Sequence, residues 1–176
     1  QRQHRQRQPA QDRRGGDGDQ AGQRPRPAED DQDRPRDQRR RDTEHRLAHD
    51  VDAWVATASP DGVPHLVPLS FDWDGAALLL STPAASPTAR NLAATRTVRL
   101  ALGPTRDVTV IVGDVEVVDA PPREAADRFA ARTGFDPREE PVPYGWFRVT
   151  PRRVQSWREA DELPGRELLR DGRWLA

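Results

Sequence analysis

The chain has 176 residues, enough for one domain with an appended tail, and its formal net charge of −1 argues against a general nucleic-acid binder. It contains no cysteine, which excludes disulfide bonds and thiolate chemistry. No apolar run approaches the roughly 20 residues of a membrane span, and the first residues are too polar for a signal peptide, so we expect a cytoplasmic protein.

Residues 1–42 differ in composition from the rest of the chain, because they contain no Leu, Val, Ile, Phe or Trp. Such a segment cannot bury enough apolar surface to offset the conformational entropy of ordering, roughly 1–2 kcal/mol per residue. Its arginines alternate with acids such as Asp33 and Asp37, so no basic block for nucleic acid builds up. The composition predicts a disordered tail over residues 1–42 and a folded domain over residues 43–176.

A short helix is expected over residues 43–52, with Thr43 as its N-cap. His45 and His49 are four residues apart, which places them on one helical face at a possible metal-ligand spacing. No Glu follows His45, as the zinc-protease pattern requires, and the only other candidate ligand is the isolated His65. We therefore expect two partly solvated histidines and no metal site.

Three strands are expected next, at residues 53–58, 63–71 and 76–80. An Asp-Gly pair, Asp74-Gly75, separates the second strand from the third, and this pair between apolar runs favours a hairpin because glycine adopts φ > 0 without penalty. Two prolines in the second strand cannot donate to a ladder, which predicts an irregular or edge position with backbone groups available to a ligand.

A hydroxyl-rich loop follows the third strand and opens a helix at Pro87, for which Ser86 is the expected N-cap. Helix N-termini present unpaired N–H groups to anions. This segment is therefore a candidate site for a phosphorylated cofactor. Residues 97–102 and 106–118 then read as strands, and Gly113 predicts a bulge or bend in the longer one.

An amphipathic helix is expected over residues 120–133, with Gly134 as its C-cap. Phe129 is its only large apolar residue, so it alone is expected to anchor the helix. Residues 144–157 form the last expected strand, and Trp174 near the end of the chain is expected to pack back onto the domain.

From about Arg46 onward, the order of these motifs resembles the flavin-binding split barrels of the pyridoxamine 5'-phosphate oxidase type. The resemblance rests on GVPHLVPLSF, DGAALLLST, RNL, RDVTVIVGDVEVV and RVTPRRVQSW, in that order. It implies a mainly β fold: a six-stranded, antiparallel split β-barrel with two or three short helices, assembled as a homodimer. An exposed aromatic surface on a lone barrel of this size would also favour an interface.

The resemblance implies a flavin-type oxidoreductase that binds FMN or the deazaflavin coenzyme F420 and transfers hydride to or from a small molecule. No catalytic acid, base or nucleophile is evident in the sequence, which suits an enzyme whose cofactor carries the chemistry. The alternative is a non-catalytic split-barrel protein that binds or sequesters a flavin or haem. The substrate is not indicated by any motif.

The resemblance also implies which residues meet the cofactor. The strand lining the flavin ring and reaching its phosphate corresponds to His65, Leu66, Val67, Pro68, Leu69 and Ser70, although the same pattern fits an ordinary hairpin strand. The hydroxyl pair beside the phosphate or ribityl chain corresponds to Ser81 and Thr82, followed by Ser86, Thr88, Arg90 and Asn91 in the loop and helix. Asp107 stands where the family has an amide, and Trp157 matches a Trp that reaches the cofactor across the dimer interface, although simple packing explains it equally well.

The chain departs from the oxidase itself at the phosphate. The oxidase has basic residues at four positions that correspond here to His65, Ser70, Pro87 and Thr88, none of which is a permanent cation. A charge-assisted hydrogen bond contributes roughly 1.5–3 kcal/mol, so a substitute is needed, and Arg90 and Arg106 are the candidates. The oxidase's substrate-binding Arg–Leu–His–Asp–Arg ending is also absent, so a true pyridoxamine phosphate oxidase is not expected.

Overall fold

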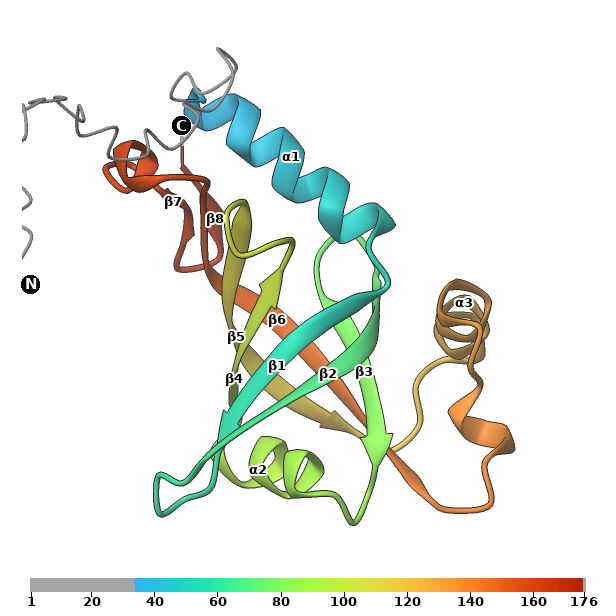
Figure 1. Ribbon diagram of the computed structural model, residues 1–176. Coiled ribbons are helices and arrows are strands. Elements are labelled where there is room, and N and C mark those ends of the chain that lie inside the picture. The colour runs from blue at the N-terminus through green and yellow to red at the C-terminus, as the bar shows by residue number, and fades with distance from the viewer. Residues whose placement is uncertain (1–33, 176) are drawn as a thin grey trace, which may run out of the picture. The chain divides into compact units, whose positions relative to one another are not determined.

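The computed structural model describes residues 34–175 (Figure 1), so the disorder predicted for residues 1–33 lies outside the described residues. The described part contains three α-helices, two short 3-10 helices and eight strands. None of the helices in this range is both long and apolar enough to cross a membrane.

The barrel is a closed antiparallel sheet of six strands in the order β3-β2-β1-β4-β5-β6, closed by pairing between β3 and β6. This architecture confirms the mainly β, six-stranded fold. Two further strands, β7 (Glu167–Arg170) and β8 (Arg173–Trp174), extend the sheet beyond β6 and were not predicted. The barrel strands are β1 (Asp52–Ala58), β2 (Pro64–Trp73), β3 (Leu78–Pro83), β4 (Thr97–Leu102), β5 (Val108–Val118) and β6 (Tyr144–Trp157).

Helix α1 (Arg36–His49) corrects the predicted boundary at residue 42 and the predicted helix start at Thr43. Pro35 is the N-cap, and Thr43 lies fully buried within the helix, 3.4 Å from the Thr109 hydroxyl. The first turns are held by guanidinium contacts rather than by apolar burial: Arg39 is buried and donates to the carbonyls of Glu162 and Gly165. Composition alone hides such contacts, because arginine is normally a surface residue.

The β2–β3 hairpin forms as predicted, although β2 continues through Trp73. The Asp74 carboxylate accepts hydrogen bonds from the amides of Ala76 and Ala77 at 2.8 and 2.7 Å, and Gly75 has φ of 96°. The predicted irregularity at Gly113 is also confirmed, since the β5–β6 register shifts between Val112 and Gly113. A Cβ at Gly113 would overlap Val149, so a side chain does not fit there.

Helix α2 (Pro87–Thr95) lies at the end of the barrel opposite α1, whereas α3 (Arg123–Thr133) stands beside the barrel wall (Figure 1). Phe129 anchors α3 as predicted, because it is buried and packs edge-on against Trp146 with ring centroids 5.2 Å apart. Gly134 ends α3 in the left-handed conformation with φ of 69°. The 3-10 helices are η1 (Pro137–Glu139) and η2 (Ala160–Glu162).

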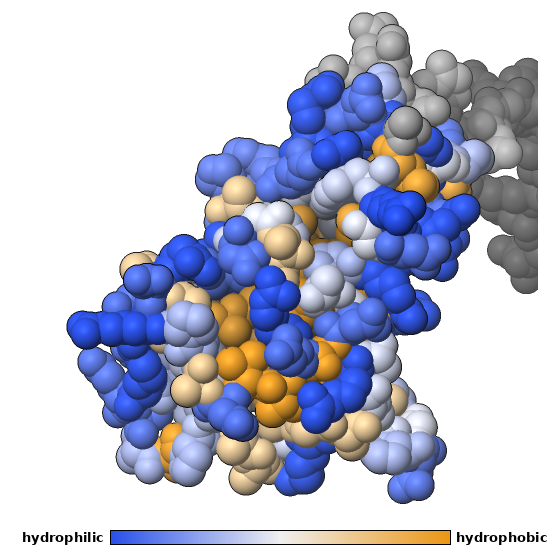
Figure 2. All heavy atoms as spheres, turned by 180° about the vertical axis from the view of Figure 1, so that it is seen from behind, coloured by the Kyte–Doolittle hydropathy of each residue, from blue (hydrophilic) through white to orange (hydrophobic). Residues whose placement is uncertain are grey.

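The core fills the barrel with aliphatic and aromatic side chains, among them Val55, Phe71, Leu80, Leu100, Ile111 and Val149. Trp174 packs against this cluster, as predicted. Hydrophobic residues also gather on the face shown in Figure 2, bordered by hydrophilic residues. On the β1–β2 hairpin, Trp54, Val63 and Leu66 are 52%, 64% and 59% exposed, so a second apolar surface is open to a partner.

Candidate cofactor site

The hydroxyl groups of Thr82 and Ser86 meet where β3 leads into α2, whereas Ser81 lies on the opposite face of β3 from Thr82. Ser81 and Thr82 are buried at the end of β3, opposite Trp146 and Gly145 of β6. The Ser81 hydroxyl donates to the Gly145 carbonyl at 3.1 Å, and the Thr82 hydroxyl lies 3.3 Å from that of Ser86. Ser81, Thr82 and Ser86 thus lie in one short segment, with their hydroxyl groups directed to defined partners.

The N-terminus of α2 offers a backbone donor to an anion. Ser86 caps the helix as predicted, accepting from the Ala89 amide at 3.0 Å, while the Arg90 amide bonds to the Ser86 carbonyl at 3.1 Å. Pro87 has no N–H, which leaves the Thr88 amide as the first-turn donor without an acceptor inside the helix. The helix dipole adds a partial positive charge at this point.

Arg90 is the one cation in the segment from Ser81 to Thr95. Its side chain is exposed, and its guanidinium folds back to donate to the Ala85 carbonyl at 2.5 Å. That bond holds the positive charge beside the loop that precedes α2. Arg90 therefore lies close to the helix N-terminus rather than extending into solvent along the helix.

Asn91 fixes α2 against β1. Its side-chain amide donates to the Thr57 hydroxyl at 3.1 Å, and both residues are buried. Thr57 pairs with His65 across β1 and β2, so this contact links the helix to the predicted cofactor strand. Sequence reasoning missed Thr57, although its inward position was readable from the alternation of Ala53, Val55 and Thr57 along the strand.

The six predicted residues of β2 divide between the two faces of the strand. His65, Val67 and Leu69 are half-buried and pair with the buried β1 residues Thr57, Val55 and Ala53. Leu66 and Pro68 are exposed and pair with Ala56 and Trp54, while the half-buried Ser70 donates to the Asp52 carboxylate at 2.6 Å. Of the six residues, only His65, Val67 and Leu69 lie on the same side of the sheet as Thr57 and α2.

Arg106, Asp107 and Trp157 do not join the hydroxyl cluster within one chain. Trp157 ends β6 and pairs with Val108, whereas Trp146 lies opposite Ser81 near the start of β6. Trp157 is eleven positions after Trp146, so the two tryptophans lie about 35 Å apart along β6. Trp157 is therefore remote from the hydroxyl groups of its own chain, and its contact with the cofactor across a dimer interface stays a prediction.

The side chains of Arg106 and Asp107 have other partners. Asp107 forms ion pairs with Arg34 at 3.1 Å, Arg46 at 2.6 Å and Arg158 at 3.3 Å. Arg106 is 79% exposed and faces Glu159 at 3.5 Å. In this chain Asp107 serves an ion-pair network at the α1 end of the barrel, and Arg106 lies too far from α2 to replace a phosphate ligand there.

The two histidines of α1, His45 and His49, contact each other. The His45 and His49 rings stack with centroids 4.0 Å apart, and His49 Nδ1 donates to the His45 carbonyl at 2.8 Å. Among residues 34–175, no three His, Cys, Asp or Glu side chains are grouped so as to hold a metal ion.

Residues 46–158 match the family model described as pyridoxamine 5'-phosphate oxidase. The chain belongs to this family. The match covers more than half of the chain and spans all six barrel strands, which confirms the resemblance seen in the sequence. A comparison with curated proteins finds no match.

Solved structures share the fold of this pyridoxamine 5'-phosphate oxidase family member. An F420 reductase is 22% identical with a TM-score of 0.54, covering 63% of this chain and 94% of its own. The haem storage protein HutZ from Vibrio cholerae is 13% identical with a TM-score of 0.56, covering 66% of this chain and 92% of its own. A putative pyridoxamine 5'-phosphate oxidase from Listeria innocua is 15% identical with a TM-score of 0.53, covering 67% of this chain and 98% of its own. At these identities the likeness concerns the fold.

The donor set at α2 fits a phosphate group. A free backbone amide, the hydroxyls of Thr82, Ser86 and Thr88, and the Arg90 guanidinium are donors gathered at a helix N-terminus, the arrangement that binds phosphate in many folds. No carboxylate lies in the segment from Ser81 to Thr95 to oppose an anion.

Proposed function

We propose that the protein is an oxidoreductase that binds a phosphorylated flavin, FMN or the deazaflavin coenzyme F420, with the phosphate at the N-terminus of α2. The observation that carries the proposal is the gathering of Thr82, Ser86, Thr88 and Arg90 at that terminus in a barrel of the pyridoxamine 5'-phosphate oxidase family. The substrate would be a small molecule.

In this proposal the chain binds and orients while the cofactor, when bound, supplies hydride chemistry. The Thr88 amide and the Ser86 and Thr82 hydroxyls donate to the phosphate, and Arg90 neutralises part of its charge. The hydrogen bond from Asn91 to Thr57 holds α2 against β1, so the donors keep their position when the phosphate arrives. His65, Val67 and Leu69, on the same side of β2 as this bond, would line the ring system.

We propose further that the protein acts as a homodimer. Trp54, Val63 and Leu66 leave an exposed apolar surface on the β1–β2 hairpin, and burial in a dimer would remove it from water. A second copy would also bring its own Trp157 to a site that the Trp157 of the same chain does not reach.

The alternative is a non-catalytic protein that binds a flavin or haem. His65 supports this alternative because it is a half-buried imidazole opposite Thr57, beside the α2 contact, where it is a possible axial ligand to haem iron. The missing phosphate cations at Ser70, Pro87 and Thr88 favour the alternative as well.

The test is an absorption spectrum of the purified protein, followed by titrations with FMN, coenzyme F420 and haemin. Saturable binding of FMN or F420, together with reduction of the bound cofactor by a hydride donor, supports the oxidoreductase. Tight haemin binding that His65→Ala abolishes, without flavin binding, supports the alternative. Failure to bind any of the three contradicts both.

A further inference from the structure

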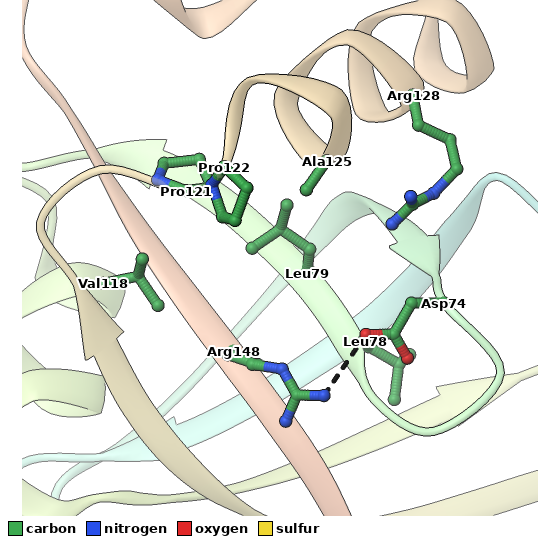
Figure 3. A pocket seen from close by; sticks show the side chains of 9 residues that line it. All are labelled: Asp74, Leu78, Leu79, Val118, Pro121, Pro122, Ala125, Arg128 and Arg148. Atoms are coloured by element: carbon green, nitrogen blue, oxygen red, sulfur yellow. Dashed lines mark hydrogen bonds and ion pairs between the residues drawn. The ribbon is translucent and has the colours of Figure 1, made fainter.

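A pocket of about 160 Å3 lies between the start of α3 and the outer surface of β3, β5 and β6 (Figure 3). Leu79 lies at its centre, and Val118, Pro121, Pro122 and Ala125 supply further apolar surface. Asp74, Arg128 and Arg148 lie on the other side, so the pocket has an apolar wall and a charged wall.

The Asp74 carboxylate is already committed to its own neighbours. One oxygen accepts from the amides of Ala76 and Ala77, and the other accepts from Arg148 at 3.2 Å. Burial acts to raise the pKa of Asp74, but these hydrogen bonds outweigh it and hold the pKa below its ordinary value. Asp74 is therefore an ionised turn residue that orients Arg148.

Both arginines keep donors for a ligand. Arg128 uses Nε to bind Asp72 at 2.8 Å, and no hydrogen bond to another described residue occupies its two terminal nitrogens. Arg148 donates to Asp74 and, at 3.3 Å, to the Thr150 hydroxyl, which leaves its Nε–H without a partner within residues 34–175. A guanidinium has only donors, so the group that binds here must be an acceptor.

The size and charge of the pocket define that acceptor. Arg128 and Arg148, with Arg132 at 3.9 Å from Asp72, give three guanidinium groups against the two carboxylates of Asp72 and Asp74. The net positive charge that remains matches a monoanion. A cavity of about 150 Å3 accommodates a benzene ring, so the apolar wall suits a body of that size. The planar fork of arginine pairs best with a carboxylate or phosphate.

We propose that this pocket binds a small monocarboxylate with a compact apolar body, its carboxylate held by Arg128 and Arg148 and its body against Leu79, Val118 and Pro122. The site is separate from the cofactor site at α2 and does not depend on the proposed function. It gives the protein a place to bind an apolar organic acid as a ligand or as a substrate.

The experiment is a 19F NMR titration of the full chain with 4-fluorobenzoate and with 4-fluorobenzamide, which has a similar shape and no charge. 4-Fluorobenzoate should bind saturably and at least about tenfold more tightly than 4-fluorobenzamide, because the uncharged amide cannot form a charge-assisted hydrogen bond with the arginines. Equal binding of the two probes, or no saturable binding of either, would overturn the proposal.

Variants locate the binding. Arg148→Gln should weaken fluorobenzoate binding about tenfold, whereas Arg152→Gln, on the same strand and 53% exposed, should leave it unchanged. Ala125→Phe should block the pocket while keeping both arginines, and saturating FMN should not displace the probe. If Arg148→Gln and Arg152→Gln behave alike, or if FMN displaces the probe, the acid does not bind where we place it.

Discussion

Glu162 shows how single charged residues hold this fold together. Its carboxylate is buried and accepts from Arg34 Nε at 2.9 Å, from Arg34 Nη2 at 3.0 Å and from the Arg158 amide at 2.7 Å. Burial acts to raise the pKa of Glu162, but the bonds from Arg34 and the backbone amides prevail and lower the pKa to about 2. The network ties the segment before α1 to η2.

Glu162→Gln should lower the free energy of unfolding by about 2 kcal/mol at pH 7, because the buried Arg34 loses its charge-assisted hydrogen bonds to Glu162 and keeps only its ion pairs with Asp42 and Asp107. The lowered pKa means that this stabilisation is present above the ordinary pKa of 4.5 and is lost as the pH falls toward 2. Urea unfolding at a series of pH values measures both effects.

Glu159→Gln is the matched control, since Glu159 faces the exposed Arg106 and should contribute little. The wild type should lose more stability than Glu162→Gln between pH 4.5 and 2. If the stabilities of the wild type and of Glu162→Gln fall in parallel as the pH is lowered, the stabilising role given to the Glu162 carboxylate is wrong.

Among the elements, those specified by local signals were predictable. The Asp-Gly turn, the Ser86 cap, the Gly134 cap and the alternation of β5 depend on neighbouring residues, and all are present. The start of α1 was not predictable because its stabilising contacts are distant in sequence: Arg39 reaches carbonyls at residues 162 and 165. The short β7 and β8 carried no strong strand pattern.

Because α1 begins at Arg36, residues 34–42 should stabilise the domain, whereas composition predicted a disordered tail there. A chain that begins at Asp33 should be more stable than one that begins at Thr43, by several degrees in Tm. The shorter chain loses Arg34 and Arg39 and leaves Glu162 buried without its cation. Thermal unfolding followed by circular dichroism compares the two, and equal melting temperatures would show that residues 33–42 contribute nothing.

At the scale of the whole molecule, the sequence predicted part of the candidate site. Ser81, Thr82, Ser86 and Thr88 lie within one short segment, so local reasoning grouped them. The remoteness of Trp157 follows from the length and direction of β6, which a motif does not reveal. Trp157 can contact a cofactor at α2 only if it comes from a second chain, so the proposed site depends on dimer formation.

A homodimer should have a mass of about 40 kDa by light scattering, twice the 19.8 kDa of one chain. Trp54→Arg should produce monomers, because it places a charge on the exposed apolar face of β1. Val142→Arg, at a residue 51% exposed elsewhere, should leave the mass unchanged. A wild-type monomer that still binds FMN would rule out a site shared between two chains.

The affinities of FMN and riboflavin for Arg90→Ala test most directly whether the phosphate binds at the N-terminus of α2. The variant should bind FMN roughly ten- to a hundredfold more weakly, equivalent to about 1.4–2.8 kcal/mol, while riboflavin, which lacks the phosphate, should lose little. Arg96→Ala, at the other end of α2, should change neither affinity. Equal losses for FMN and riboflavin, or no loss for either, would contradict the placement of the phosphate at α2.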